Sequence, residues 1–395
     1  MSVNYNSYFS WNTPTILPDF ADPVDELQAL NEAGIRGGTS SPETFGMNLV
    51  TLRNGIIDWK QKYAGKNGNV MVKGEDWDII GGRAYFFKVW DPKEEMLNKF
   101  TFSQQHNISI QGGGDKIGYY VSGGYSRDGG VFKLNPDEVS KYNVTLGLNA
   151  SPTKWLDLSV RSLNRNFSYD FPYSYQDYWY YFWRWGSYFP YGTYDGNYFR
   201  VNSAYMAGAS KSNVTSNYQR MDFGATVKIN KNISIRADYT LSRDNVLRHE
   251  TGGPIMAWDF WTAGDLKLAD IASAASNAVT YTSGRMMINT FNTYATFQKA
   301  LGQGHNFKVT AGINAEKDET INFFASRKGL LDPSQGELGL TYADQGSGVA
   351  GSGVPGWATN GHGIRAFAGY FGRINYDYKG KYLLELNERY DGSSS

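Results

Sequence analysis

Apolar and polar residues alternate with a period of two along many segments of this chain. The alternation is regular from Tyr142 to Leu148, from Leu156 to Arg161, from Met221 to Ile229 and from Ile233 to Leu241. Because successive side chains of a β-strand point to opposite faces, these segments predict strands with one apolar and one polar face. We expect such strands to be about 10–14 residues long, enough to cross the hydrocarbon core of a membrane at a tilt.

The connections between the predicted strands alternate between very short and very long. The short turns are Gly112–Lys116, Ser151–Lys154, Asn230–Asn232, Leu301–His305 and Lys379–Lys381. The long connections are a first loop at 12–99 and loops centred on Asp128–Ser140, Phe167–Asn217, Asn245–Gly284 and Asp318–Ile364. Outer-membrane β-barrels have short periplasmic turns and long extracellular loops.

An all-β fold, a transmembrane antiparallel β-barrel, is therefore predicted. With a first strand at Val3–Trp11, the sequence predicts eleven strands. The alternative is a soluble β-sandwich or β-solenoid with amphipathic sheets. Soluble strands average about 5–6 residues, and charged residues on an inner strand face are costly in a packed core. Both considerations favour the barrel.

Composition excludes several classes of protein. The 395 residues include 38 basic and 38 acidic side chains, so the chain lacks the basic excess of a nucleic-acid binder. The absence of cysteine excludes a disulfide framework and a Cys-ligated zinc site. No apolar run is long enough for a transmembrane helix. Met1–Asn4 carries no signal-peptide pattern, so we expect a processed chain or a piece of a longer one.

The sequence contains no pattern typical of an enzyme. Its four histidines, His106, His249, His305 and His362, are not spaced as metal ligands, and no metalloprotease or nucleophile-elbow motif occurs. We therefore predict no catalytic residues, no cofactor and no metal site. A calcium ion in the loops, near Asp259–Asp265, is left open.

Several hairpins carry a resemblance to a known family. The segments His106–Gly113 and Lys116–Tyr125 resemble the "HN(L/I)S(I/V)xGG…Y…S.GY" hairpin of SusC/RagA-type outer-membrane transporters. Gly369–Tyr378 and Arg389–Ser394 resemble that family's "GYFGRxNYxYxxKYLL…RxDGSS" block, and Asp76-Trp77 corresponds to the "DW" of its first long loop.

The resemblance implies a TonB-dependent transporter of a Bacteroidetes-type outer membrane. Such transporters have a barrel of about 22 strands closed by a plug; they pair with a SusD-like surface lipoprotein and import glycans or, in some members, peptides. Residues 1–395 would form the N-terminal half of the barrel without its plug, through which the TonB system acts. The lipid bilayer and an oligosaccharide would be its other partners. Two alternatives are a peptide importer and a surface β-protein that binds glycans without transport.

The loop at 167–217 is unusually aromatic, since fifteen of the 25 residues from Phe167 to Tyr191 are Phe, Tyr or Trp. Aromatic rings stack on the apolar faces of sugars, but they also fill protein interfaces. The loop is therefore either a sugar-binding surface or a packed cover of the barrel mouth. The predicted substrate-binding residues are Tyr178, Trp179, Trp183, Arg184, Trp185, Tyr188, Trp258 and Trp261. Short helices are predicted at Pro23–Ala33 and Pro42–Tyr63 of the first loop.

Overall fold

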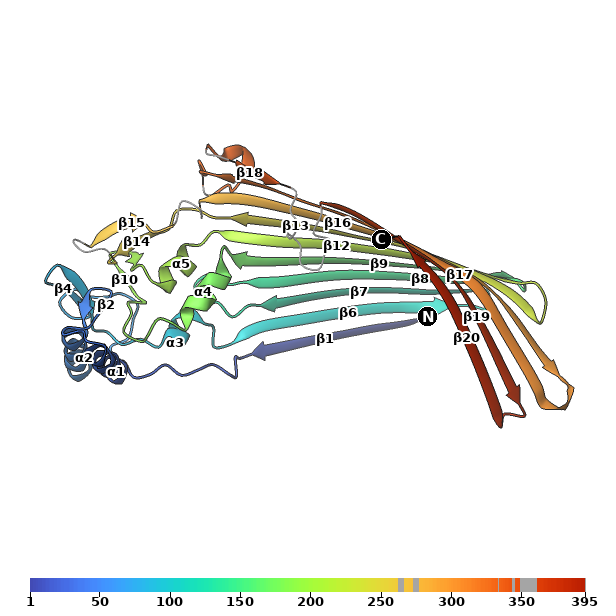
Figure 1. Ribbon diagram of the computed structural model, residues 1–395, viewed down its shortest axis with the longest axis horizontal. Coiled ribbons are helices and arrows are strands. Elements are labelled where there is room, and N and C mark those ends of the chain that lie inside the picture. The colour runs from blue at the N-terminus through green and yellow to red at the C-terminus, as the bar shows by residue number, and fades with distance from the viewer. Residues whose placement is uncertain (262–265, 273–276, 333, 343–344, 349–360, 395) are drawn as a thin grey trace.

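The computed structural model describes residues 1–261, 266–272, 277–332, 334–342, 345–348 and 361–394. One large antiparallel sheet dominates it, and its strands follow chain order from edge to edge (Figure 1). The strands are β1 (Ser2–Asn12), β6 (Thr101–Gly113), β7 (Ile117–Gly129), β8 (Glu138–Thr153), β9 (Leu156–Pro172), β12 (Lys211–Lys228), β13 (Ile233–Thr251), β16 (Ala278–Leu301), β17 (His305–Lys328), β19 (His362–Tyr378) and β20 (Tyr382–Ser393). The predicted path of eleven strands is confirmed, and a short β18 (Gln345–Gly348) pairs beside β17.

All the long connections lie at one end of the sheet and all the short turns at the other (Figure 1). The chain enters at the turn end through β1 and runs towards the loop end, where the helices gather. The predicted alternation of short and long connections is thus confirmed. The described sheet remains open, since β1 and β20 form its two edges.

One face of the sheet is apolar across neighbouring strands. The strand register brings Leu148, Val160, Phe223, Tyr239 and Phe291 into one continuous row over β8, β9, β12, β13 and β16. Phe223 is 41% exposed although it lies in the middle of this row. Large apolar side chains that no protein element covers are expected where strands face lipid.

The opposite face is polar and carries paired charges. Arg236 donates to Asp238 at 2.7 Å, and Arg220 donates to Asp222 at 2.9 Å. The Thr240 hydroxyl donates to Asp222 from the neighbouring strand at 2.7 Å. Such groups are costly beside lipid or in a dry core, so this face belongs to the interior of a barrel, which is polar in outer-membrane proteins.

The strands are longer than their alternation predicted. β16 and β17 have 24 residues each. β9 continues to Pro172 and β12 begins at Lys211, so the aromatic connection between them is 173–210 rather than 167–217. The reason is that hydrogen-bonded ladders continue beyond the lipid layer. There, neither face has to be apolar, so the periodic signal ends before the strand does.

Short elements fill the loop end. The helices are α1 (Pro23–Arg36), α2 (Leu49–Tyr63), α3 (Pro92–Met96), α4 (Tyr175–Phe182) and α5 (Asn202–Gly208). Two-stranded ribbons are formed by β2 (Glu43–Thr44) with β3 (Met47–Asn48), β4 (Trp77–Ile80) with β5 (Arg83–Phe86), β10 (Thr193–Tyr194) with β11 (Asn197–Tyr198), and β14 (Met256–Asp259) with β15 (Lys267–Asp270). Single 3₁₀ turns lie at Gly302–Gly304 and Leu338–Leu340. Among the described helices, none has the length and apolar character needed to span a membrane.

The two predicted helices exist with corrected bounds. α1 begins at Pro23, where the Asp22 side chain accepts from the Val24 N–H, and it continues past Gly34 to Arg36. The backbone N–H of Gly37 donates to the Ala33 carbonyl at the end of the helix, so α1 ends at Arg36 and not at the predicted Ala33. The segment predicted as a helix from Pro42 begins instead as the β2–β3 hairpin, because Gly46 turns the chain with a φ of +75°.

A charge on the apolar face is expected to destabilise the sheet. Leu146 pairs with Val121 of β7 and lies between Val144 and Leu148 on the apolar face of β8. In the full-length protein folded in lipid, Leu146→Arg should lower the free energy of unfolding by about 2–4 kcal/mol. Asn149→Arg, three residues along on the polar face, should change it by less than about 1 kcal/mol. Equal losses in urea titrations would contradict the assignment of the two faces.

Candidate functional site: the loop assembly

The long connections pack into one body, which we call the loop assembly: residues 13–100, 130–137, 173–210, 252–261 and 266–272. Its core contains Leu27 and Ile56 from the first connection, Phe182 and Tyr191 from the third, and Phe260 from the fourth, all of them buried. The large sheet supplies little of this core. The loop assembly is therefore a small packed domain in its own right, held together by the hydrophobic effect.

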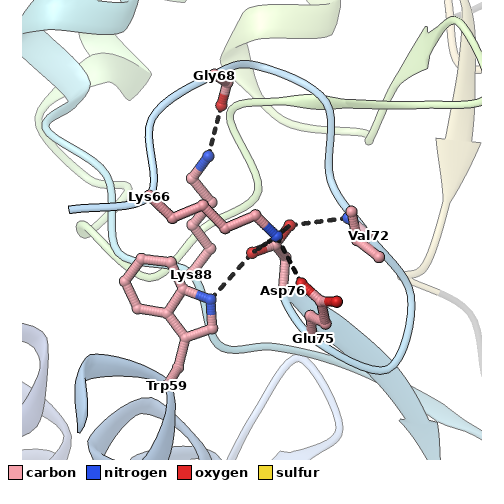
Figure 2. A network of polar contacts seen from close by, with 7 residues as sticks. All are labelled: Trp59, Lys66, Gly68, Val72, Glu75, Asp76 and Lys88. Carbon is pink, nitrogen blue, oxygen red and sulfur yellow. Dashed lines mark hydrogen bonds and ion pairs between the residues drawn. The ribbon is translucent and has the colours of Figure 1, made fainter. Parts of the chain in front are cut away.

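Asp76 organises the first connection (Figure 2). This carboxylate is fully buried and accepts hydrogen bonds from the Trp59 indole at 3.0 Å, from the Val72 N–H at 2.8 Å and from Lys66 at 3.0 Å. Its backbone carbonyl accepts from the Phe87 N–H at 2.8 Å. A buried carboxylate is stable only when it is paired and hydrogen-bonded, so this network joins α2, the segment before β4 and the segment after β5.

The two lysines of the network have different environments. Burial acts to lower the pKa of Lys66, but its hydrogen bonds to Glu75 and Asp76 outweigh burial and raise it. Burial lowers the pKa of Lys88, whose ammonium donates to the Gly68 carbonyl and lies 4.0 Å from the centre of the Trp90 ring. The backbone N–H of Trp90 in turn donates to the Ser187 carbonyl at 2.8 Å. The network therefore reaches the aromatic connection.

The aromatic connection folds inward over the polar face of the sheet. Phe171 of β9 lies on the same face of its strand as Arg165, and Tyr175 of α4 packs edge-on against it at 5.4 Å between ring centres. Phe132, from the connection between β7 and β8, packs against Tyr175 at 6.2 Å. The sequence did not predict α4, because its eight residues are mostly aromatic and lack a polar face of helical period.

The predicted substrate-binding residues divide into three groups. Tyr178, Trp185 and Tyr188 are buried in the core of the loop assembly, and burial raises the pKa of Tyr188. Trp183, Trp258 and Trp261 are half-buried against that core. Trp179 and Arg184 are exposed. The aromatic stretch thus serves packing first, and sugar contact by the exposed members stays a prediction.

One cavity of about 610 Å³ gathers residues of the third and fourth connections. Three of the predicted residues, Tyr178, Trp185 and Trp261, line it. The lining residues that the sequence analysis missed include Tyr181, Arg200, Asn202 and Tyr205. Arg200 carried a weak signal, as the one cation in the aromatic run from Tyr198 to Tyr205.

Arg200 is the polar centre of the cavity. It donates to Asp259 at 2.8 Å and to the Tyr205 hydroxyl at 3.2 Å, and its guanidinium lies 4.4 Å from the centre of the Trp261 ring. The Trp261 indole donates back to the Arg200 carbonyl at 2.9 Å. Because these contacts join two connections that are far apart in sequence, the cavity wall is preorganised.

Within the described residues, no three His, Asp or Glu side chains come together as a metal site. Of the segment Asp259–Asp265, considered above for calcium, positions 262–265 lie outside the described residues.

Known proteins resemble this chain in sequence and in fold. No family model matches it. A stretch of 98 residues is 31% identical to the TonB-dependent receptor P26 of Formosa agariphila and covers 25% of this chain and 9% of that receptor. The RagAB peptide transporter matches 99% of the chain with a TM-score of 0.62 and 14% identity, and the RagAB peptide importer in its open-open state does so with 0.62 and 15%. The chain covers 42% of each of those chains.

The fold is that of a transmembrane β-barrel of the outer membrane, represented by part of its strands. Within that class the chain is similar to the SusC/RagA-type TonB-dependent transporters, as its hairpin motifs indicated. The proteins reported above are named as a receptor and as transporters, not as enzymes.

Removing the Asp76 carboxylate is expected to loosen the first connection. In the full-length protein, Asp76→Ala leaves the Trp59 indole, the Val72 N–H and Lys66 without their acceptor and should cost about 3 kcal/mol of local stability. Limited proteolysis of residues 13–100 measures the effect. The matched control is Asp78→Ala, because Asp78 accepts only from the adjacent Ile79 N–H. Equal protease resistance of the two variants would contradict the organising role of Asp76.

Proposed function

We propose that this chain is part of a transporter that imports oligosaccharide across the outer membrane, in complex with a SusD-like surface lipoprotein. Its 395 residues form about the first half of the barrel. The energy comes from the TonB system. The observation that carries the proposal is the aromatic cavity of the loop assembly, which lies at the loop end of a sheet with a polar inner face.

The fold supports import in general. A barrel with a polar interior gives solutes a route past the lipid, and loops packed over its mouth select what enters. The loop assembly also presents exposed rings, including Trp179 and Tyr180, to the outside. Tyrosine and tryptophan provide rigid contact area with partners and ligands, which suits a site shared with a lipoprotein.

Peptide import is the second candidate. It is favoured by the solved proteins of the same fold, the RagAB peptide transporter and peptide importer. Oligosaccharide is preferred for this chain because six of the fifteen described lining residues of the cavity are aromatic, and aromatic rings stack on the C–H faces of sugars. A surface protein that binds glycans without transport is the third reading, and a requirement for TonB separates it from the first two.

Substitution of two tryptophans in the aromatic connection should distinguish a role in ligand binding from a role in packing. Trp179 is 37% exposed, whereas Trp185 is 6% exposed in the core. In cells that carry the full-length transporter, Trp179→Ala should reduce oligosaccharide uptake with a smaller loss of stability than Trp185→Ala, because the half-exposed Trp179 ring packs along one side, against Phe182 and Phe132. Trp185→Ala should instead destabilise the loop assembly by about 3–5 kcal/mol. Uptake of labelled oligosaccharide and protease sensitivity of the surface loops are the two measurements.

The controls concern energy coupling and substrate class. Uptake should cease when TonB is deleted, while surface binding persists. Uptake of tryptic peptides in place of oligosaccharide would favour the second candidate. Uptake that is independent of TonB would exclude both import candidates.

A further inference from the structure

We propose that the cavity between the third and fourth connections is a subsite for one uncharged sugar unit, with the Arg200–Asp259 pair as its polar wall. The inference rests on the proposed import of oligosaccharide and adds the location of a binding site and the charge class of its ligand. The cavity volume of about 610 Å³ lies within the range of small-ligand sites.

The polar wall is electrically balanced. Arg200 is the one charged side chain among the described lining residues, and Asp259 offsets its charge at 2.8 Å. One N–H of Arg200 is directed to Asp259 and another to Tyr205, which leaves part of its five-donor fork for a ligand. A ligand carboxylate would have to compete with Asp259 for the same guanidinium. Sugar hydroxyls instead accept from the remaining N–H groups and leave the ion pair intact.

The apolar wall offers a ring for stacking. Tyr181 lines the cavity and is 44% exposed, so part of its ring is accessible to a ligand. Tyr178 and Tyr205 close the cavity as a stacked pair with ring centres 5.9 Å apart. Arg200 lies over the Trp261 ring, and Trp185 packs against Trp261 in a tilted arrangement with ring centres 5.5 Å apart. Aromatic rings and a polar group that line one cavity match a pyranose, which has an apolar face and a hydroxylated edge.

Rigidity of the polar wall supports a site rather than a packing gap. The Asp259 carboxylate also accepts from the backbone N–H of Trp261 at 3.0 Å. The backbone N–H of Arg200 donates to the Trp258 carbonyl at 3.0 Å. The Asp259 end of the ion pair is thus held by the backbone of its own connection, and the Arg200 end by the backbone of the facing one. A ligand that binds there meets groups already in place, which reduces the entropic cost of binding.

The test measures ligand affinity with the full-length transporter in complex with its lipoprotein, by titration calorimetry. The probes are neutral hexaoses of glucose, mannose, galactose and xylose, an oligogalacturonate, and a tryptic digest of casein. The decisive variant is Tyr181→Ala, because an exposed ring can be removed without loss of core packing. Its matched control is Tyr180→Ala, in the same helix, 54% exposed and outside the cavity lining. Arg200→Lys keeps the charge but removes the planar fork.

We expect a neutral hexaose to bind, with Kd raised at least tenfold by Tyr181→Ala and by Arg200→Lys, and changed less than twofold by Tyr180→Ala. Tyr181→Phe should restore affinity, since the ring rather than the hydroxyl stacks. Tighter binding of oligogalacturonate, or no binding of any neutral hexaose, overturns the assignment to an uncharged sugar.

Other outcomes separate this inference from the proposed function. Unchanged Kd for a neutral hexaose in both Tyr181→Ala and Arg200→Lys overturns the subsite and leaves oligosaccharide import standing. Binding and uptake of casein peptides alone overturn both. Loss of affinity in Tyr180→Ala equal to that in Tyr181→Ala shows a general loop effect and also overturns the subsite.

Discussion

The structure depends on one constraint: in lipid, every backbone N–H and C=O must be paired within the protein. Antiparallel strands satisfy it by hydrogen-bonding to their neighbours in chain order, except along the outer edges of β1 and β20 in the described sheet. The same constraint sets the side-chain pattern, because an apolar row such as Leu148, Val160 and Phe223 must face lipid while Asp222 and Arg236 face inward. The short turns at one end and long connections at the other follow from this up-and-down path.

A sheet of this kind contributes little packed core of its own, so the extended surface outside the lipid has to be stabilised separately. The loop assembly does this with a dense aromatic and aliphatic core and with the buried Asp76 network. Most of the rings in the aromatic connection are therefore committed to packing. The few that remain exposed, and the cavity beside Arg200, are where the chain can select a ligand.

The sheet and the loop assembly determine the neighbours of a residue in different ways. In the sheet, neighbours are set by register, and each residue's environment follows from its position on the strand. In the loop assembly, neighbours come from connections far apart in sequence, as in the Arg200–Asp259 pair, whose members are 59 residues apart. This arrangement lets the loops vary while the strands keep one architecture.

The sequence by itself determined the fold class, the strand path and the end at which the long connections gather, because a period of two and the length of a turn are local properties. It also located α1, though not its end, and the aromatic connection. Only the tertiary structure decided that Trp185 and Tyr188 are buried while Trp179 is exposed, and that Tyr181 and Arg200 line a cavity with Trp261. Those facts depend on how separate connections pack against each other, and no local pattern encodes a contact between residues that distant.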